Sequence, residues 1–185
     1  EVSSYGITNF YLLDSLFWYT ASRLYWRIQP GEGGENWDEQ QKNKIIGVSW
    51  DIKEDLSQVE DISEVVIKYR KKKSGQSKVS KQLKNFRDVV QIGDFVVANN
   101  GFSEILGVGK VTSEYHYNPE FEDFSHIRDI DWFDVSSKII PKQDWARITI
   151  NKITRETFEA VTEKQVSPVY ITSQDPLLKK FSKIL

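Results

Sequence analysis

Residues 44–56, KIIGVSWDIKEDL, decide how this chain folds. The run 45–48 is rich in β-branched residues, and this pattern predicts a short buried strand. Trp50 and Asp51 follow at the end of that strand. A tryptophan in this position either caps the core or forms one wall of a pocket.

A second stretch, residues 93–117, is expected to be the partner of the first. It begins GDFVVANNGFSEILGVGKV, which predicts strands at 95–98 and 105–112 around a turn at 99–101, since Asn and Gly tolerate positive φ. The two glycines of the second strand predict a bulge or a close backbone approach. The stretch ends in the aromatic run 115–117, and strands that carry aromatic residues to their ends can form a cup for a flat ligand.

Over the whole chain the predicted strands outnumber the predicted helices. Besides those above, strands are expected at 24–28 and 127–133, a strand or turn at 143–150, helices at 7–19, 62–69, 79–87 and 154–163, and a helix or a linker at 173–185. Trp26, Trp132 and Trp145 are interpreted as core residues, and Trp37 as either core or surface. Because strands and helices do not alternate regularly, we expect an α+β domain built on a small curved or barrel-like sheet.

Composition limits the classes of function. A chain of 185 residues suits one domain with its own core. The net charge of −2 is not that of a uniformly basic nucleic-acid binder, although local patches remain possible. The absence of cysteine excludes disulfides and thiol nucleophiles, and two histidines argue against a multi-histidine zinc site. No apolar run approaches the roughly 20 residues that cross a bilayer, so we expect a cytoplasmic chain without a membrane partner.

Motifs for catalysis are scarce. The sequence has no phosphate-binding GxxxxGK[ST] loop and no GxSxG nucleophile elbow. Asp129 and Asp131 are two residues apart on a predicted strand and therefore share one face, where they could hold Mg²⁺ as in a nuclease. We keep this metal-dependent nuclease as a remote alternative and expect no catalytic residue, metal or cofactor.

Basic residues form two local groups. The run 70–73 contains Lys71, Lys72 and Lys73, and the predicted helix 79–87 directs Lys78 and Lys81 outward. A charge run is usually a solvated face, but next to a pocket these lysines, together with Arg128, would contact phosphates.

The aromatic residues support a more specific hypothesis. Two flat rings around an extruded nucleobase contribute about 1–3 kcal/mol each by stacking. The candidate cage residues are Trp50, Tyr115, Tyr117 and Phe121, and the candidates for hydrogen bonds to the base edge are Asp51, Asn99 and Asn100. The alternative interpretation is that Trp50 fills the core and the tyrosines lie on the surface.

Several of these motifs, taken in order, resemble an EVE domain, and in particular the N-terminal DNA-reading domain of archaeal McrB proteins. The resemblance covers roughly residues 22–145 and rests on YWRIQPGE at 25–32, Trp37, IGVSWD at 46–51, GDFVVAN at 93–99, LGVGKV at 106–111 and YHYNP at 115–119. EVE domains belong with YTH and ASCH domains to the PUA-like superfamily. The resemblance therefore implies a curved β-barrel flanked by helices.

The resemblance also implies base flipping of a modified nucleotide. In YTH domains a cage tryptophan directly follows the second strand, and Trp50 occupies the matching place. Tyr115, Tyr117 or Phe121 would then close the cage. The residue after the first cage tryptophan contacts the base edge in YTH domains, and here it is Asp51. A carboxylate there accepts from an exocyclic N–H, which favours N6-methyladenine in DNA over 5-methylcytosine, with methylated RNA as an alternative.

The same resemblance suggests how the chain is organised. We expect an N-terminal helix or arm at 1–21, the base-binding domain at 22–170, and at 171–185 a helix or a linker to a downstream AAA+ GTPase domain. In McrB systems a GTPase oligomer and a separate nuclease subunit do the enzymatic work. The chain itself is therefore expected to be a non-catalytic reader of methylated DNA in a restriction complex.

Overall fold

A computed structural model describes residues 23–162, and residues 24–162 of these belong to one compact unit. The predicted helix at 7–19, the predicted tail at 173–185 and the domain boundaries near 22 and 170 lie outside the described residues. None of the described helices combines the length and apolar character that a membrane span requires.

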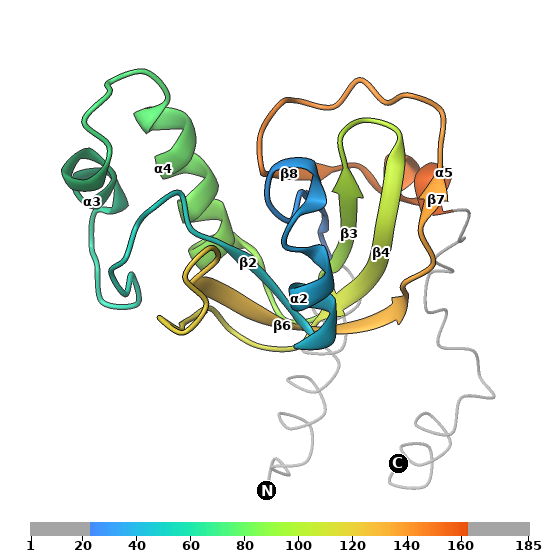
Figure 1. The fold of residues 1–185 in the computed structure, drawn as a ribbon, viewed down its shortest axis with the longest axis horizontal. Coiled ribbons are helices and arrows are strands. Elements are labelled where there is room, and N and C mark those ends of the chain that lie inside the picture. Colours follow the sequence, from blue (N-terminus) through green and yellow to red (C-terminus); the bar gives the residue numbers. More distant parts are fainter. Residues whose placement is uncertain (1–22, 163–185) are drawn as a thin grey trace, which may run out of the picture. The chain divides into compact units, whose positions relative to one another are not determined.

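The described residues form one mixed sheet that curls into a half-barrel (Figure 1). Its strands are β1 (Tyr25–Ile28), β2 (Ile45–Val48), β3 (Phe95–Asn100), β4 (Glu104–Val111), β5 (His116–Tyr117), β6 (His126–Asp134), β7 (Lys138–Ile139) and β8 (Ile150–Ile153). They run in the order β2-β6-β4-β3-β1-β8, while β5 pairs with β6 and β7 pairs with β4. Strands β1 and β3 pair in parallel, and the other pairs are antiparallel.

A few helices flank the sheet. They are α2 (Trp37–Lys42), α3 (Ile62–Tyr69), α4 (Gln76–Lys84) and α5 (Arg155–Thr162), with a 3₁₀ turn η1 (Glu32–Gly34) and a π turn η2 (Asn85–Val89) that extends α4. Helix α3 begins after Asp61, whose carboxylate accepts a hydrogen bond from the Ser63 amide at 2.8 Å. Helices α3 and α4 lie side by side (Figure 1). The predicted α+β class and curved sheet are confirmed.

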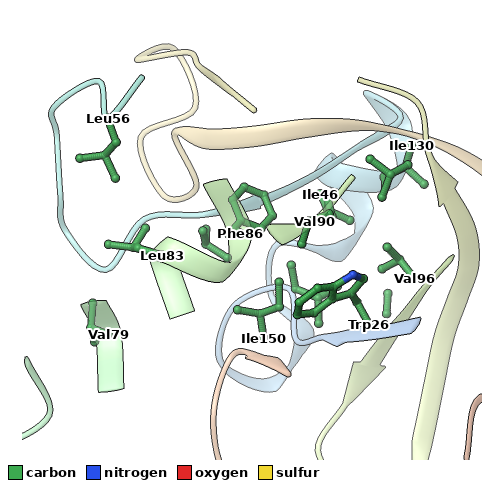
Figure 2. Packing of buried hydrophobic residues seen from close by; sticks show 14 of the residues in the cluster. Trp26, Ile46, Leu56, Val79, Leu83, Phe86, Val90, Val96, Ile130 and Ile150 are labelled. Atoms are coloured by element: carbon green, nitrogen blue, oxygen red, sulfur yellow. The ribbon is translucent and has the colours of Figure 1, made fainter. Parts of the chain in front are cut away.

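The core lies between the sheet and helix α4 with its π turn (Figure 2). Val79, Leu83 and Phe86 point into it, as the period of the predicted helix 79–87 requires. Trp26 and Trp145 are buried, which confirms their interpretation as core residues.

The remaining two core tryptophans meet at the glycines of β4. Trp37 is buried with its ring edge-on to half-buried Trp132, at 5.0 Å between ring centroids. A Cβ atom on Gly107 would lie 2.4 Å from the Trp37 ring, and one on Gly109 would lie 2.5 Å from Ile130. The register with β6 also shifts at Gly109. The predicted close approach and bulge are therefore both present.

Two sequence predictions differ from the structure in their boundaries. Strand β3 continues through Asn100, so the turn lies at 101–103 rather than 99–101. Residues 143–149 contain no strand, and β8 begins at Ile150. In both places the pairing partner, rather than local propensity, determines where the strand begins or ends.

Candidate functional site

A cavity of about 660 Å³ opens where several segments of the chain meet. These are the end of β1 with the following η1 region, the end of β2, the β3–β4 turn, the β5–β6 loop at Asp123 and the irregular segment 146–149. The lining residues that define its chemistry are Arg27, Ser49, Trp50, Phe102 and Arg147. The volume lies within the range of small-molecule sites in proteins, about 300–1,000 Å³.

Trp50 forms one wall of this cavity. Its half-buried side chain packs against the core and also lines the cavity, so it combines both roles considered from the sequence. Trp50 and Asp51 have φ angles of 51° and 62°. A bulky side chain in this left-handed region costs on the order of 1–3 kcal/mol, and such strain is concentrated at functional sites.

Arg27 holds the floor of the cavity together. Its side chain is 1% exposed, and Nη1 donates to Oδ1 of Asn99 at 3.2 Å. Nη2 donates to the carbonyl of Ala146 at 3.1 Å and to that of Ile148. The guanidinium also lies over the Trp145 ring, 5.4 Å from the centroid. One side chain of β1 thus fixes β3 and the segment 146–149.

The floor carries positive charge. Burial lowers the pKa of Arg27 to about 10, which still leaves the guanidinium charged at neutral pH. Within residues 23–162 no Asp or Glu forms an ion pair with it, and its buried Nε has no hydrogen-bond partner. Exposed Glu32, Asp123 and Arg147 also line the cavity. A ligand that offers hydrogen-bond acceptors to the floor is therefore favoured.

Tyr115 does not line the cavity, contrary to its prediction as a cage residue. Its hydroxyl accepts from the Leu56 amide at 3.1 Å and donates to Nδ1 of His126 at 2.8 Å, while His126 Nε2 donates to the Ile52 carbonyl at 3.0 Å. Tyr115 and His126 therefore hold the segment 52–56, which follows Trp50. Burial raises the pKa of Tyr115 to about 12.

The other two predicted cage partners also lie elsewhere. Tyr117 packs on the His126 ring at 5.4 Å, and Phe121 stacks on Phe124 at 5.1 Å, and neither lines the cavity. The second aromatic residue of the cavity is Phe102, which the sequence analysis missed. Phe102 directly follows the predicted turn at 99–101, and its place beside that turn is the sequence feature that could have identified it.

The predicted base-edge residues do not line the cavity. Asn99 is buried and uses its amide on Arg27 and on the Gly101 carbonyl, at 2.6 Å from the latter. Asn100 donates to Glu104 at 2.9 Å, and Asp51 is exposed. Asn99 therefore acts on the site indirectly, through Arg27 and through Gly101, which both line the cavity. The position of Arg27 in a short buried strand gave no hint of a cavity.

Arg128 is corrected as a predicted phosphate contact, because its side chain is fully buried. Its guanidinium donates to the carbonyls of Phe86, Arg87 and Ser113, at 2.8, 2.7 and 3.1 Å. It fastens η2 to β6 and does not reach the surface.

The predicted lysines fall into two places. Lys71, Lys72 and Lys73 are exposed in the loop between α3 and α4 (Figure 1). Lys78 and Lys81 are exposed on α4 and line a second hollow together with Arg147. Arg147 lines both this hollow and the cavity, so of the predicted lysines only Lys78 and Lys81 lie in a hollow that adjoins the cavity.

The acidic pair considered for a nuclease lies on the surface. Asp129 and Asp131 are both exposed on β6, and Asp129 lies 3.7 Å from Nε2 of His116. Within residues 23–162 no three His, Asp or Glu side chains gather as metal ligands would.

Comparison with known proteins identifies a family. The profile of a family described as a domain of unknown function, DUF8426, matches residues 26–161. No curated protein matches the chain. Two solved structures are similar to it at low identity: an NMR structure from Rhodopseudomonas palustris and a crystal structure from Agrobacterium tumefaciens. The first is 17% identical with a TM-score of 0.40, and the second 15% with 0.39; each comparison covers 76% of this chain and 91% of the other.

Proposed function

The chain belongs to the DUF8426 family, and we propose that it is a PUA-like reader of modified nucleic acid. In this proposal a methylated base leaves its helix and enters the cavity beside Trp50. N6-methyladenine in DNA is the first choice of ligand, with 5-methylcytosine and methylated RNA as alternatives. The reader would direct a GTPase oligomer and a nuclease subunit to the methylated DNA.

The observation that carries this proposal is the position of Trp50. A large aromatic ring is held in a strained backbone conformation at the wall of a cavity, where it also contacts the core. Stacking on such a ring is worth about 1–3 kcal/mol per base. A methyl group on the base adds apolar contact with the same wall.

The floor of the cavity suits the edge of a base. The charged Arg27 guanidinium at the lining favours a ring nitrogen or carbonyl oxygen of the base, and the Ser49 hydroxyl is able to donate or accept. Phe102 supplies a second apolar surface in the same cavity. These residues replace Tyr115 and Asp51 in the proposed contacts.

The test is binding to short duplexes that carry one N6-methyladenine, one 5-methylcytosine or no modification, with RNA of the same sequence alongside. We expect preference for N6-methyladenine in DNA. Trp50→Ala should weaken that binding by about 5- to 150-fold, which corresponds to the stacking energy of one base. Trp50→Phe should restore part of the loss.

Tyr117→Ala is the matched control, because Tyr117 is an aromatic residue that the sequence placed in the cage and the structure places outside the cavity. It should leave the preference unchanged. Preference for 5-methylcytosine or for RNA would support the cavity as the binding site but would identify a different ligand. Equal binding to all probes, unchanged in Trp50→Ala at unchanged melting temperature, would refute the reader function.

A further inference from the structure

A second hollow of about 340 Å³ adjoins the cavity. We call it the α4 groove and define it by Lys78, Lys81 and Asn85, by the segment 146–148 and by Asn151 of β8. Residues 146–148 line both the groove and the cavity. The two hollows are therefore neighbours with one segment of chain between them.

The α4 groove is positively charged throughout. Its lining contains Lys78, Lys81 and Arg147 and no Asp or Glu among the described residues, although the whole chain has a net charge of −2. Another hollow beside α4 differs, because there Lys81 and Lys84 face Glu60 and Asp61. Lys81 lines both of these hollows, and the acidic residues belong only to the lining of the one that lies away from the segment 146–148.

The segment between the two hollows is held from both sides. On the groove side Oε1 of Gln82 accepts from the amides of Thr149 and Ile150, at 2.8 and 3.1 Å. On the cavity side Arg27 donates to the carbonyls of Ala146 and Ile148. These bonds fix the segment between the two hollows, so the groove keeps its place beside the cavity.

We infer that the α4 groove binds the phosphates that flank the base in the cavity. Three cations next to amide donors match the charge and hydrogen-bonding capacity of a nucleic-acid backbone. The ligand is then a nucleotide within a strand, and a free nucleoside lacks half of the contacts. Arg147, which lines both hollows, lies where the backbone passes from one to the other. This inference rests on the proposed function.

The test is the salt dependence of binding to the modified duplex. Each lost phosphate contact makes the negative slope of log K against log salt shallower by about 0.9, so the variant Lys78→Gln/Lys81→Gln, which leaves every cavity residue in place, should make it shallower by up to about 2. Modified and unmodified duplexes should weaken by the same factor, which leaves their ratio unchanged. Binding of the free N6-methylated deoxynucleoside, measured by calorimetry, should not change.

The variant Lys72→Gln/Lys73→Gln is the charge-matched control. It removes two cations from the α3–α4 loop and should change the slope by less than one unit, because those residues do not line either hollow. An unchanged slope in the groove variant, or an equal change in the control, would overturn the inference. Base preference that depends on Trp50 would survive that result, so failure of the inference is distinguishable from failure of the proposed function.

Discussion

His126 is the residue whose protonation the fold opposes most clearly at moderate acidity. The side chain is completely buried, and burial lowers its pKa to about 4. With Nε2–H donating to Ile52 and Nδ1 accepting from Tyr115, the neutral ring has both nitrogens satisfied. A proton on Nδ1 would remove the acceptor that Tyr115 uses. The neutral ring therefore helps to hold the segment after Trp50.

This predicts that stability falls as the pH drops. The unfolded chain takes up a proton at His126 near pH 6.5, while the folded chain does so only near pH 4. The unfolded state therefore binds more protons between these values, and the free energy of unfolding decreases by about 3 kcal/mol from pH 7 to pH 4. Urea titrations across this range measure the decrease.

Carboxylates also titrate in acid, so the comparison is with His126→Gln, which should lose about 3 kcal/mol less than the unchanged protein over the same interval. His116→Gln alters an exposed histidine and should keep the full dependence. Parallel curves for all three proteins would show that His126 does not titrate as the structure indicates.

At the scale of elements, helix α2 packs on β4 because β4 has glycines where it meets aromatic rings. Gly107 lies beneath Trp37, whose ring in turn meets Trp132 from β6. The absence of a Cβ allows the helix, β4 and β6 to approach closely. Helix α2 leads through Lys44 into β2, so this packing also positions the start of β2 and, at its end, Trp50.

We therefore predict that Gly107→Ala destabilises the fold. The added Cβ would lie 2.4 Å from the Trp37 ring, a distance that requires the ring or the strand to move. Overpacking of this kind typically costs about 1–3 kcal/mol, which chemical denaturation will measure. Gly75→Asn is the control, because Gly75 has open space around its Cβ position and a positive φ of 88° that Asn tolerates. Equal stability of Gly107→Ala and the unchanged protein would contradict the packing.

At the scale of the whole described unit, the cavity is an assembly of segments that are distant in sequence. Its walls include the ends of β1 and β2, the β3–β4 turn and residues 146–149. Arg27 in β1 connects the segment 146–149, through Ala146 and Ile148, to Asn99 near the end of β3. The shape of the cavity therefore depends on tertiary contacts more than on any one element.

This predicts that Arg27→Gln weakens the whole fold and not only the site. The shorter side chain leaves the buried acceptors without their donors, at an expected cost of about 2–4 kcal/mol in the free energy of unfolding. Guanidinium denaturation measures this cost. Arg147→Gln, at an exposed position in the same cavity, should change stability by less than about 0.5 kcal/mol. If both variants were equally stable, Arg27 would not hold the walls together.

Periodicity in the sequence was enough to predict most of the longer elements, but not the short strands β5 and β7. The strand 45–48, the helix 62–69 and the inward positions Val79, Leu83 and Phe86 all follow from local patterns of apolar residues, and the structure has them. The glycines of β4 likewise predicted a close approach, because only a missing side chain makes one possible. For Trp50 the sequence left two roles, a cap on the core or a pocket wall, and the structure combines them.

Only the tertiary structure decided which residues share the cavity with Trp50. Tyr115 and Phe102 are both aromatic residues near strand ends, and nothing local distinguishes the one that supports His126 from the one that lines the cavity. Arg27 and Arg128 were equally hard to place, because a buried arginine is stabilised by carbonyl groups far away in sequence. Local pattern determines which way a side chain faces, whereas strand order and loop packing determine what it meets there.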